Sequence, residues 1–142
     1  MRNKEKTWIV ISILLGVGIY WSCKDEITGG GPSTVVFPDS GVKYGIHVEP
    51  LFLQSCAFSG CHGEDTYATM GFSLDTYEHA TARAGIIVPC RQNEPCNPEN
   101  SILIQRIEGL NGLEQMPKYG PPLNSNQING MKTWIREGAQ NN

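Results

Sequence analysis

The sequence has little positive charge and no apolar run long enough for an ordinary membrane span. Eleven Lys and Arg residues stand against 14 Asp and Glu residues in 142 positions. Beyond Cys23 the balance is eight against thirteen, a formal net charge of −5. A nucleic-acid-binding protein needs a basic face to neutralise phosphates, so this charge argues against that class. It mildly favours a partner protein with a basic rim.

Two further patterns are missing. No segment alternates apolar and polar residues as a half-buried strand does, which argues against a sheet. No motif sets out a nucleophile, a base and an orienting group, or a pair of acids, so we expect no enzymatic activity and no small-molecule substrate. At 142 residues, without an internal repeat, the chain suggests one domain.

The longest apolar run covers residues 8–20, close to the N-terminus. Its thirteen residues fall short of the roughly twenty that a spanning helix needs. Three basic residues precede the run and Ser22 follows it, which is the pattern of a signal peptide over residues 1–22. An N-terminal anchor helix that is never cleaved is the alternative.

Cys23 follows this run directly and resembles the acylated cysteine of a bacterial lipoprotein. Residues 23–44 include three consecutive glycines, two prolines and few large apolar side chains, the composition of a flexible linker. We therefore expect a lipid on Cys23, a linker over 23–44 and a folded domain over 45–142. The chain would be exported and anchored to a membrane, facing the periplasm or the cell surface.

Helical signals dominate the expected domain. The spacing of apolar residues predicts helices over about 47–56, 98–109 and 125–138, and a shorter helix is compatible with 76–83. Asn97 before Pro98 is a typical helix start, and Asn124 with Gln127 has the spacing of a capping box. The domain is therefore expected to be all-α. Its connecting loops are long, which is unusual in a small domain unless a large cofactor fixes them.

Residues 56–63, with the sequence CAFSGCHG, carry two cysteines and a histidine in series. The usual haem c attachment sequence is Cys-x-x-Cys-His, in which two thiols add to the haem vinyl groups and the histidine binds iron. Here four residues separate Cys56 from Cys61, so the loop must bulge, which Gly60 permits. A disulfide between the two cysteines in a haem-free module is the alternative. Zinc is a poorer candidate, because a cysteine directly adjacent to His62 fits a tetrahedral site badly.

A histidine-bound c haem commonly takes a methionine sulfur on its opposite face. Met116, followed by Pro117, lies in the loop before the last predicted helix and is 54 residues beyond His62. Met70 follows His62 so closely that it would reach the opposite face only with strain. His47, His79 or an open position are the alternatives to Met116.

Taken in order, these segments resemble the small class I c-type cytochrome domains of Planctomycetes and Bacteroidetes. The matching segments are residues 48–52, 55–63, 71–77, 87–89, 98–103, 115–117, 122–123, 128 and 134–139. The resemblance implies three to four helices wrapped around one covalent haem. It implies thioether bonds at Cys56 and Cys61, and His62 and Met116 as iron ligands. It also implies electron transfer to a redox partner protein.

Cys90 and Cys96 lie six positions apart, with Asn93 and Pro95 between them. In an oxidising compartment this pair can close a small disulfide ring. A second metal or redox site is the alternative, although no histidine lies beside the pair. With a lipid on Cys23 and haem on Cys56 and Cys61, the disulfide accounts for the last two of the five cysteines.

Overall fold

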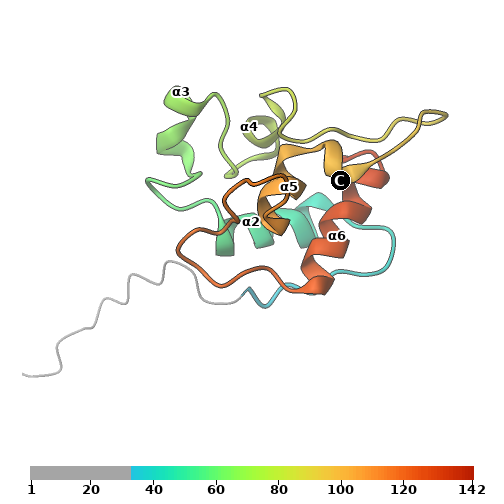
Figure 1. Ribbon diagram of the computed structural model, residues 1–142, viewed down its shortest axis with the longest axis horizontal. Coiled ribbons are helices and arrows are strands. Elements are labelled where there is room, and N and C mark those ends of the chain that lie inside the picture. Colours follow the sequence, from blue (N-terminus) through green and yellow to red (C-terminus); the bar gives the residue numbers. More distant parts are fainter. Residues whose placement is uncertain (1–32) are drawn as a thin grey trace, which may run out of the picture.

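A computed structural model of the chain describes residues 33–142, and within that range the protein is helical without any strand (Figure 1). The predicted all-α class is therefore confirmed for these residues. The elements in chain order are a π-helical turn Tyr44–Val48, α2 Glu49–Ser55, a 3-10 turn Glu64–Thr66, α3 Tyr67–Met70, α4 Tyr77–Thr81, a 3-10 turn Pro98–Asn100, α5 Ile102–Glu108 and α6 Ser125–Arg136. None of the helices in this range has the length and apolarity to cross a membrane. The predicted signal peptide (1–22) and Cys23 lie outside the described residues.

The longest helix, α6, supplies the centre of the core. Its capping box forms as predicted, because Asn124 accepts from the Gln127 backbone and the Gln127 side chain accepts from the Asn124 backbone. Trp134 and Ile135 on its inner face are fully buried, and the indole Nε1 of Trp134 donates to the Gln140 carbonyl at 3.0 Å. Buried residues of α2 and α5 complete this core. Burial of an apolar stripe on one face is the main source of such a helix's stability.

The helix predicted from Pro98 onward begins later than expected. Residues Pro98–Asn100 form a separate 3-10 turn, and α5 starts at Ile102 after an extended Ser101 (φ −79°, ψ 126°). Long-range hydrogen bonds hold Ser101 in this conformation, since its fully buried hydroxyl accepts from the Val88 N–H at 2.9 Å. The Ile102 N–H also donates to the Gly85 carbonyl at 2.9 Å. Tertiary pairing therefore overrides the local start signal.

The second half of the predicted linker is docked on α6 rather than free. The Asn126 side chain forms two hydrogen bonds with the Phe37 backbone, accepting from its N–H at 2.8 Å and donating to its carbonyl at 2.9 Å. The Phe37 ring is 4 % exposed and lies against Gly130, where it occupies the space that a Cβ would need. The helix has a glycine at this position because the aromatic ring takes the place of a side chain.

Both ends of this docked segment, residues 33–44, are tied to the same helix region. The Glu137 carboxylate accepts from the Gly41 N–H at 2.6 Å and from the Val42 N–H at 2.8 Å. At the other end, the Gln127 side chain donates to the Ser33 carbonyl at 2.9 Å. The expectation of a flexible linker across 23–44 therefore differs from the structure over 33–44, which belongs to the folded domain.

Cys90 and Cys96 form the predicted disulfide. The chain around it extends away from the helices as a long arm (Figure 1). The arm is attached to the core at its base, where the Cys90 N–H donates to the Ile135 carbonyl at 3.0 Å.

Candidate functional site

The two cysteines and the histidine of residues 56–63 follow directly from the end of α2. The N–H groups of Cys56 and Ala57 both donate to the Phe52 carbonyl at 2.8 Å, which ends the helix. The chain then reverses, with Cys61 and Gly63 both donating to the Phe58 carbonyl at 3.0 Å. Gly60 adopts the left-handed φ of +74° that the predicted bulge requires. The four-residue spacer is thus a hydrogen-bonded turn.

Two adjoining cavities, of about 360 Å³ and about 420 Å³, open beside this turn. Both are lined by His62, Met70 and Met116, so they adjoin one another, and together they are called the hollow below. Cys56 and Cys61 line the second cavity. The four residues singled out from the sequence therefore meet at one hollow, within the size range of ligand pockets in proteins.

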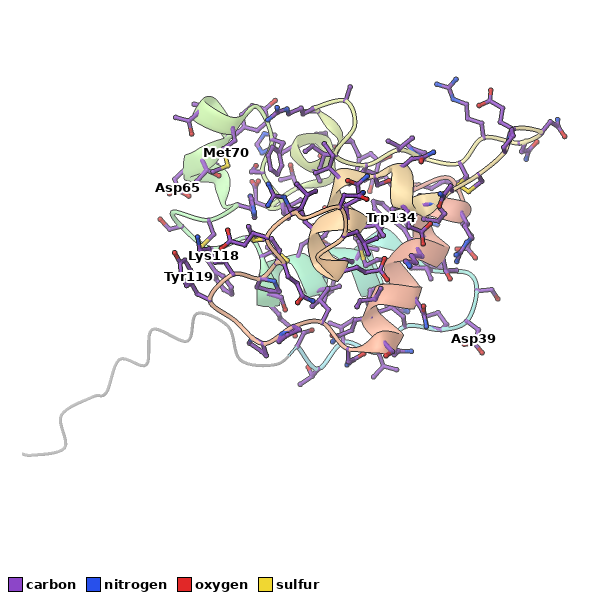
Figure 2. All side chains as sticks on the ribbon, viewed as in Figure 1. Asp39, Asp65, Met70, Lys118, Tyr119 and Trp134 are labelled. Carbon is purple, nitrogen blue, oxygen red and sulfur yellow. A yellow bond between two sulfur atoms is a disulfide. The ribbon has the colours of Figure 1, made fainter. Side chains whose placement is uncertain are left out.

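The loop that carries Met116 is held by the backbone of α5. The Met116 N–H donates to the Arg106 carbonyl at 2.8 Å, and the Gln115 side chain donates to the Ile107 carbonyl at 3.1 Å. The Met116–Pro117 peptide bond is cis. Lys118 and Tyr119, just beyond it, line the second cavity together with Met70, and Figure 2 shows all three on the same side of the molecule.

The histidines considered as alternatives to Met116 are engaged elsewhere. The His47 Nδ1 lies 3.0 Å from the Lys43 backbone nitrogen. The His79 Nδ1 lies 3.2 Å from both carboxylate oxygens of Asp75, and its ring stacks on Tyr67 with 4.1 Å between ring centroids. Neither histidine lines the two cavities. Met70, by contrast, lines both of them.

Comparison with known protein families finds a match for the middle of the chain. Residues 59–120 match the family described as Planctomycete cytochrome C. The chain carries a Planctomycete-type cytochrome c domain. The match includes Cys61, His62 and Met116 and starts three residues after Cys56. No curated protein and no solved structure matches the chain. The family implies covalently bound haem and haem-based electron transfer in general terms.

His62 of the cytochrome domain has the properties of a ligand residue. Its Nδ1 is buried and has no hydrogen-bond partner among the described residues, which is uncommon for a buried ring nitrogen. Burial, and after it the positive charge of Arg106, lower the pKa of the imidazole below 6.5. The ring is therefore neutral at neutral pH and keeps a lone pair available to a metal ion.

The two cysteines of the cytochrome domain are free thiols and do not form a disulfide with each other. Cys61 is exposed and Cys56 is half-buried. The surroundings of Cys56 nevertheless desolvate its sulfur, and this burial, with a smaller contribution from Cys61, raises the pKa of the thiol to about 12. Cys56 therefore stays protonated at neutral pH.

The chemistry of the cavity walls fits haem. Apolar side chains such as Phe72, Ile86 and Leu103 line the first cavity, as a planar macrocycle requires. Every charged side chain that lines either cavity is basic: Arg83, Arg106 and Lys118. Haem carries two carboxylates, so arginines in the wall of a largely apolar cavity match its charge.

The positions of the thiols do not suit the zinc alternative. In residues 33–142 no three His, Cys, Asp or Glu side chains gather closely enough to hold a metal ion. Cys56, Cys61 and His62 are therefore not collected around one point, as a structural zinc site needs. Haem attachment requires no such cluster, because the thiols bond to the edge of the ring and only the imidazole faces the metal.

Proposed function

We propose that this chain is a single-haem c-type cytochrome that carries electrons and catalyses no reaction of its own. Its helices would form a class I cytochrome c fold around one covalently attached haem. The observation that carries the proposal is the cavity lined by Cys56, Cys61, His62 and Met116, inside and next to the segment that matches the cytochrome family.

Each of the four residues has a distinct role in this proposal. Cys56 and Cys61 hold the haem through thioether bonds, and the His62 imidazole and the Met116 thioether bind its iron. Bound haem supplies a one-electron couple between ferric and ferrous iron, and methionine as the sixth ligand raises the potential of that couple. The apolar walls keep water from the iron, and Arg83 and Arg106 offset the charge of the haem carboxylates.

The setting of the cytochrome is part of the proposal. We propose an exported protein held at a membrane by a lipid on Cys23, facing the periplasm or the cell surface. Its partner is a redox protein rather than a nucleic acid or a small-molecule substrate. The acidic balance beyond Cys23 favours a partner with a basic docking rim.

The decisive experiment is expression of the full chain in bacteria that contain the haem-attachment machinery. We expect an intact mass larger by one haem than that of the processed, lipid-bearing polypeptide. We also expect a sharp α-band after reduction of the folded protein, and peroxidase-active haem staining that survives denaturing gels. A colourless protein of polypeptide mass, with Cys56 joined to Cys61, would refute the proposal. That outcome would favour a haem-free binding or structural module, with which the Cys90–Cys96 disulfide is equally compatible.

A pair of matched variants identifies which residue binds the haem iron on the side opposite His62. Met116→Ala should lower the reduction potential and change the spectrum of the ferric protein, because the iron loses its thioether ligand. Met70→Ala is the control, since Met70 lines the same hollow without a proposed bond to iron. A response to the Met70 change alone would assign the ligand to Met70. No response to either change would point to a histidine or to an open position.

A further inference from the structure

The loop of the proposed haem attachment site, residues 56–62, is longer than usual. A longer loop can adopt more conformations in which its two cysteines are wrongly placed for attachment. A spacer of four residues, Ala57 to Gly60, has two more than the usual attachment sequence. Every added residue increases the number of conformations that the loop can adopt. Simultaneous attachment through Cys56 and Cys61 therefore requires some group that fixes the spacer.

The carboxylate of Asp65 bonds to the middle of this spacer. Its Oδ2 accepts from the Ser59 hydroxyl at 2.9 Å and from the Gly60 N–H at 2.8 Å. The hydrogen bond from Gly60, and after it that from Ser59, lower the pKa of Asp65, so the group is ionised at neutral pH. Asp65 lies at the foot of α3, at the outer edge of the molecule (Figure 2).

The same carboxylate also lies close to Gly63, the residue that follows His62. A Cβ added to Gly63 would come within 3.0 Å of both the Asp65 Oδ1 and the Phe58 carbonyl oxygen. From the other side, Thr66 donates to the Gly63 carbonyl through its backbone at 3.0 Å and its hydroxyl at 2.8 Å. The Asp65 side chain thus bonds to the spacer before Cys61 and lies close against the backbone after His62.

We infer that Asp65 is a positioning residue for haem attachment, which holds the four-residue spacer so that Cys56, Cys61 and His62 reach the same hollow. This inference rests on the proposed function. In each attachment the cysteine S–H adds across a vinyl C=C bond. Sulfur bonds to one vinyl carbon, the hydrogen goes to the other, and nothing leaves, so no oxidant is needed. Asp65 takes no part in this step and acts only by fixing the geometry of the loop.

The test compares Asp65→Ala with wild-type protein in the full chain, matured by the haem-attachment machinery. Asp65→Asn and Ser59→Ala are milder variants, and Glu64→Ala is the control, because Glu64 is an exposed neighbouring acid with no side-chain hydrogen bond among the described contacts. Alkylation of the denatured products, followed by intact mass, counts free thiols on each haem-bearing chain. The pyridine haemochrome band independently reports any vinyl group that has not reacted.

We expect the share of chains with both thioether bonds to fall at least threefold in Asp65→Ala. Asp65→Asn should recover much of the loss, since its amide oxygen still accepts from Ser59 and Gly60, and Glu64→Ala should match the wild type. If Asp65→Ala is too unstable to collect, a lower doubly attached share in Ser59→Ala supports the inference and a wild-type share overturns it. Equal double attachment in wild type and Asp65→Ala overturns this inference alone. A wild-type protein without haem overturns the proposed function as well.

Discussion

Replacing Gly130 with alanine tests whether the docked segment is an integral part of the fold. The new Cβ would fall on the Cβ, Cγ and Cδ1 atoms of Phe37. Because Gly130 sits in the middle of α6, the helix backbone cannot give way, and the aromatic ring must leave its site. The substitution therefore displaces Phe37 while it changes only one methyl group of α6.

Two opposing effects set the expected magnitude. Alanine favours a helix interior over glycine by about 1 kcal/mol. Against this, Phe37 is 4 % exposed, and the loss of a buried aromatic side chain costs roughly 1.5–3 kcal/mol. The two hydrogen bonds between Asn126 and the Phe37 backbone add about 1 kcal/mol each if they break with it. If both hydrogen bonds break with the ring, we expect a net destabilisation of roughly 2.5–4 kcal/mol.

A double-mutant cycle makes the prediction sharp. In a Phe37→Gly background the ring and the Cβ that the new methyl group would also overlap are both absent, so Gly130→Ala should become neutral or stabilise by up to about 1 kcal/mol. Urea unfolding of the matured protein, followed by far-ultraviolet circular dichroism, gives the four free energies of the cycle. A Gly130→Ala protein that is as stable as the wild type while Phe37 is present would contradict the docking of residues 33–44.

Further predictions concern the disulfide and the ion pairs of α6. Replacing both Cys90 and Cys96 with serine should lower the free energy of unfolding by about 2 kcal/mol, because a small covalent loop is lost. Thermal unfolding measures this change in stability. The visible spectrum of the haem should stay the same. Lys132→Met should cost about 1–2 kcal/mol in urea unfolding, because the Lys132 Nζ lies 2.8 Å from both the Glu99 Oε1 and the Glu108 Oε2. The hydrogen bond from Lys132 lowers the pKa of Glu99 below its usual 4.5. The pairing therefore contributes its full stabilisation at pH values above 4.5, and this contribution is lost as the pH falls through the lowered pKa of Glu99. Wild-type stability should consequently fall more steeply in acid than that of Lys132→Met, and equal slopes would argue against the pairing.

Local signals in the sequence predicted much of the helical structure. The capping box at Asn124 and Gln127 marks the start of α6, and its apolar stripe becomes the buried face. These signals succeed because a cap and the residue that completes it lie within one turn. The start of α5 was misplaced for the opposite reason, since Ser101 is held by Val88, 13 positions away.

The docking of residues 33–44 could not be read from the sequence. Phe37 pairs with Asn126, 89 positions away, and the site for its ring is a glycine, which gives no apolar signal of its own. Asp65 was missed because its role arises only when the spacer folds back on it. An aspartate shortly after an unusually long attachment loop was the one available clue. For Met70, no sequence signal indicated a place in the cavity wall, and the turn and α3 after His62 bring it there.

If Cys23 carries the proposed lipid, the point at which the docked segment leaves the domain limits how far the cytochrome domain can move from the membrane. The Ser33 hydroxyl donates to the Gln54 side chain at 3.1 Å, two residues before Cys56. With the lipid proposed on Cys23, only the nine residues 24–32 lie between the lipid-bearing cysteine and Ser33, so this connection can span at most roughly 35 Å. Such a short connection would confine electron exchange to a layer close to the lipid surface. Partners embedded in the same membrane would meet the haem at a high effective concentration, whereas freely diffusing acceptors would gain nothing from the anchor.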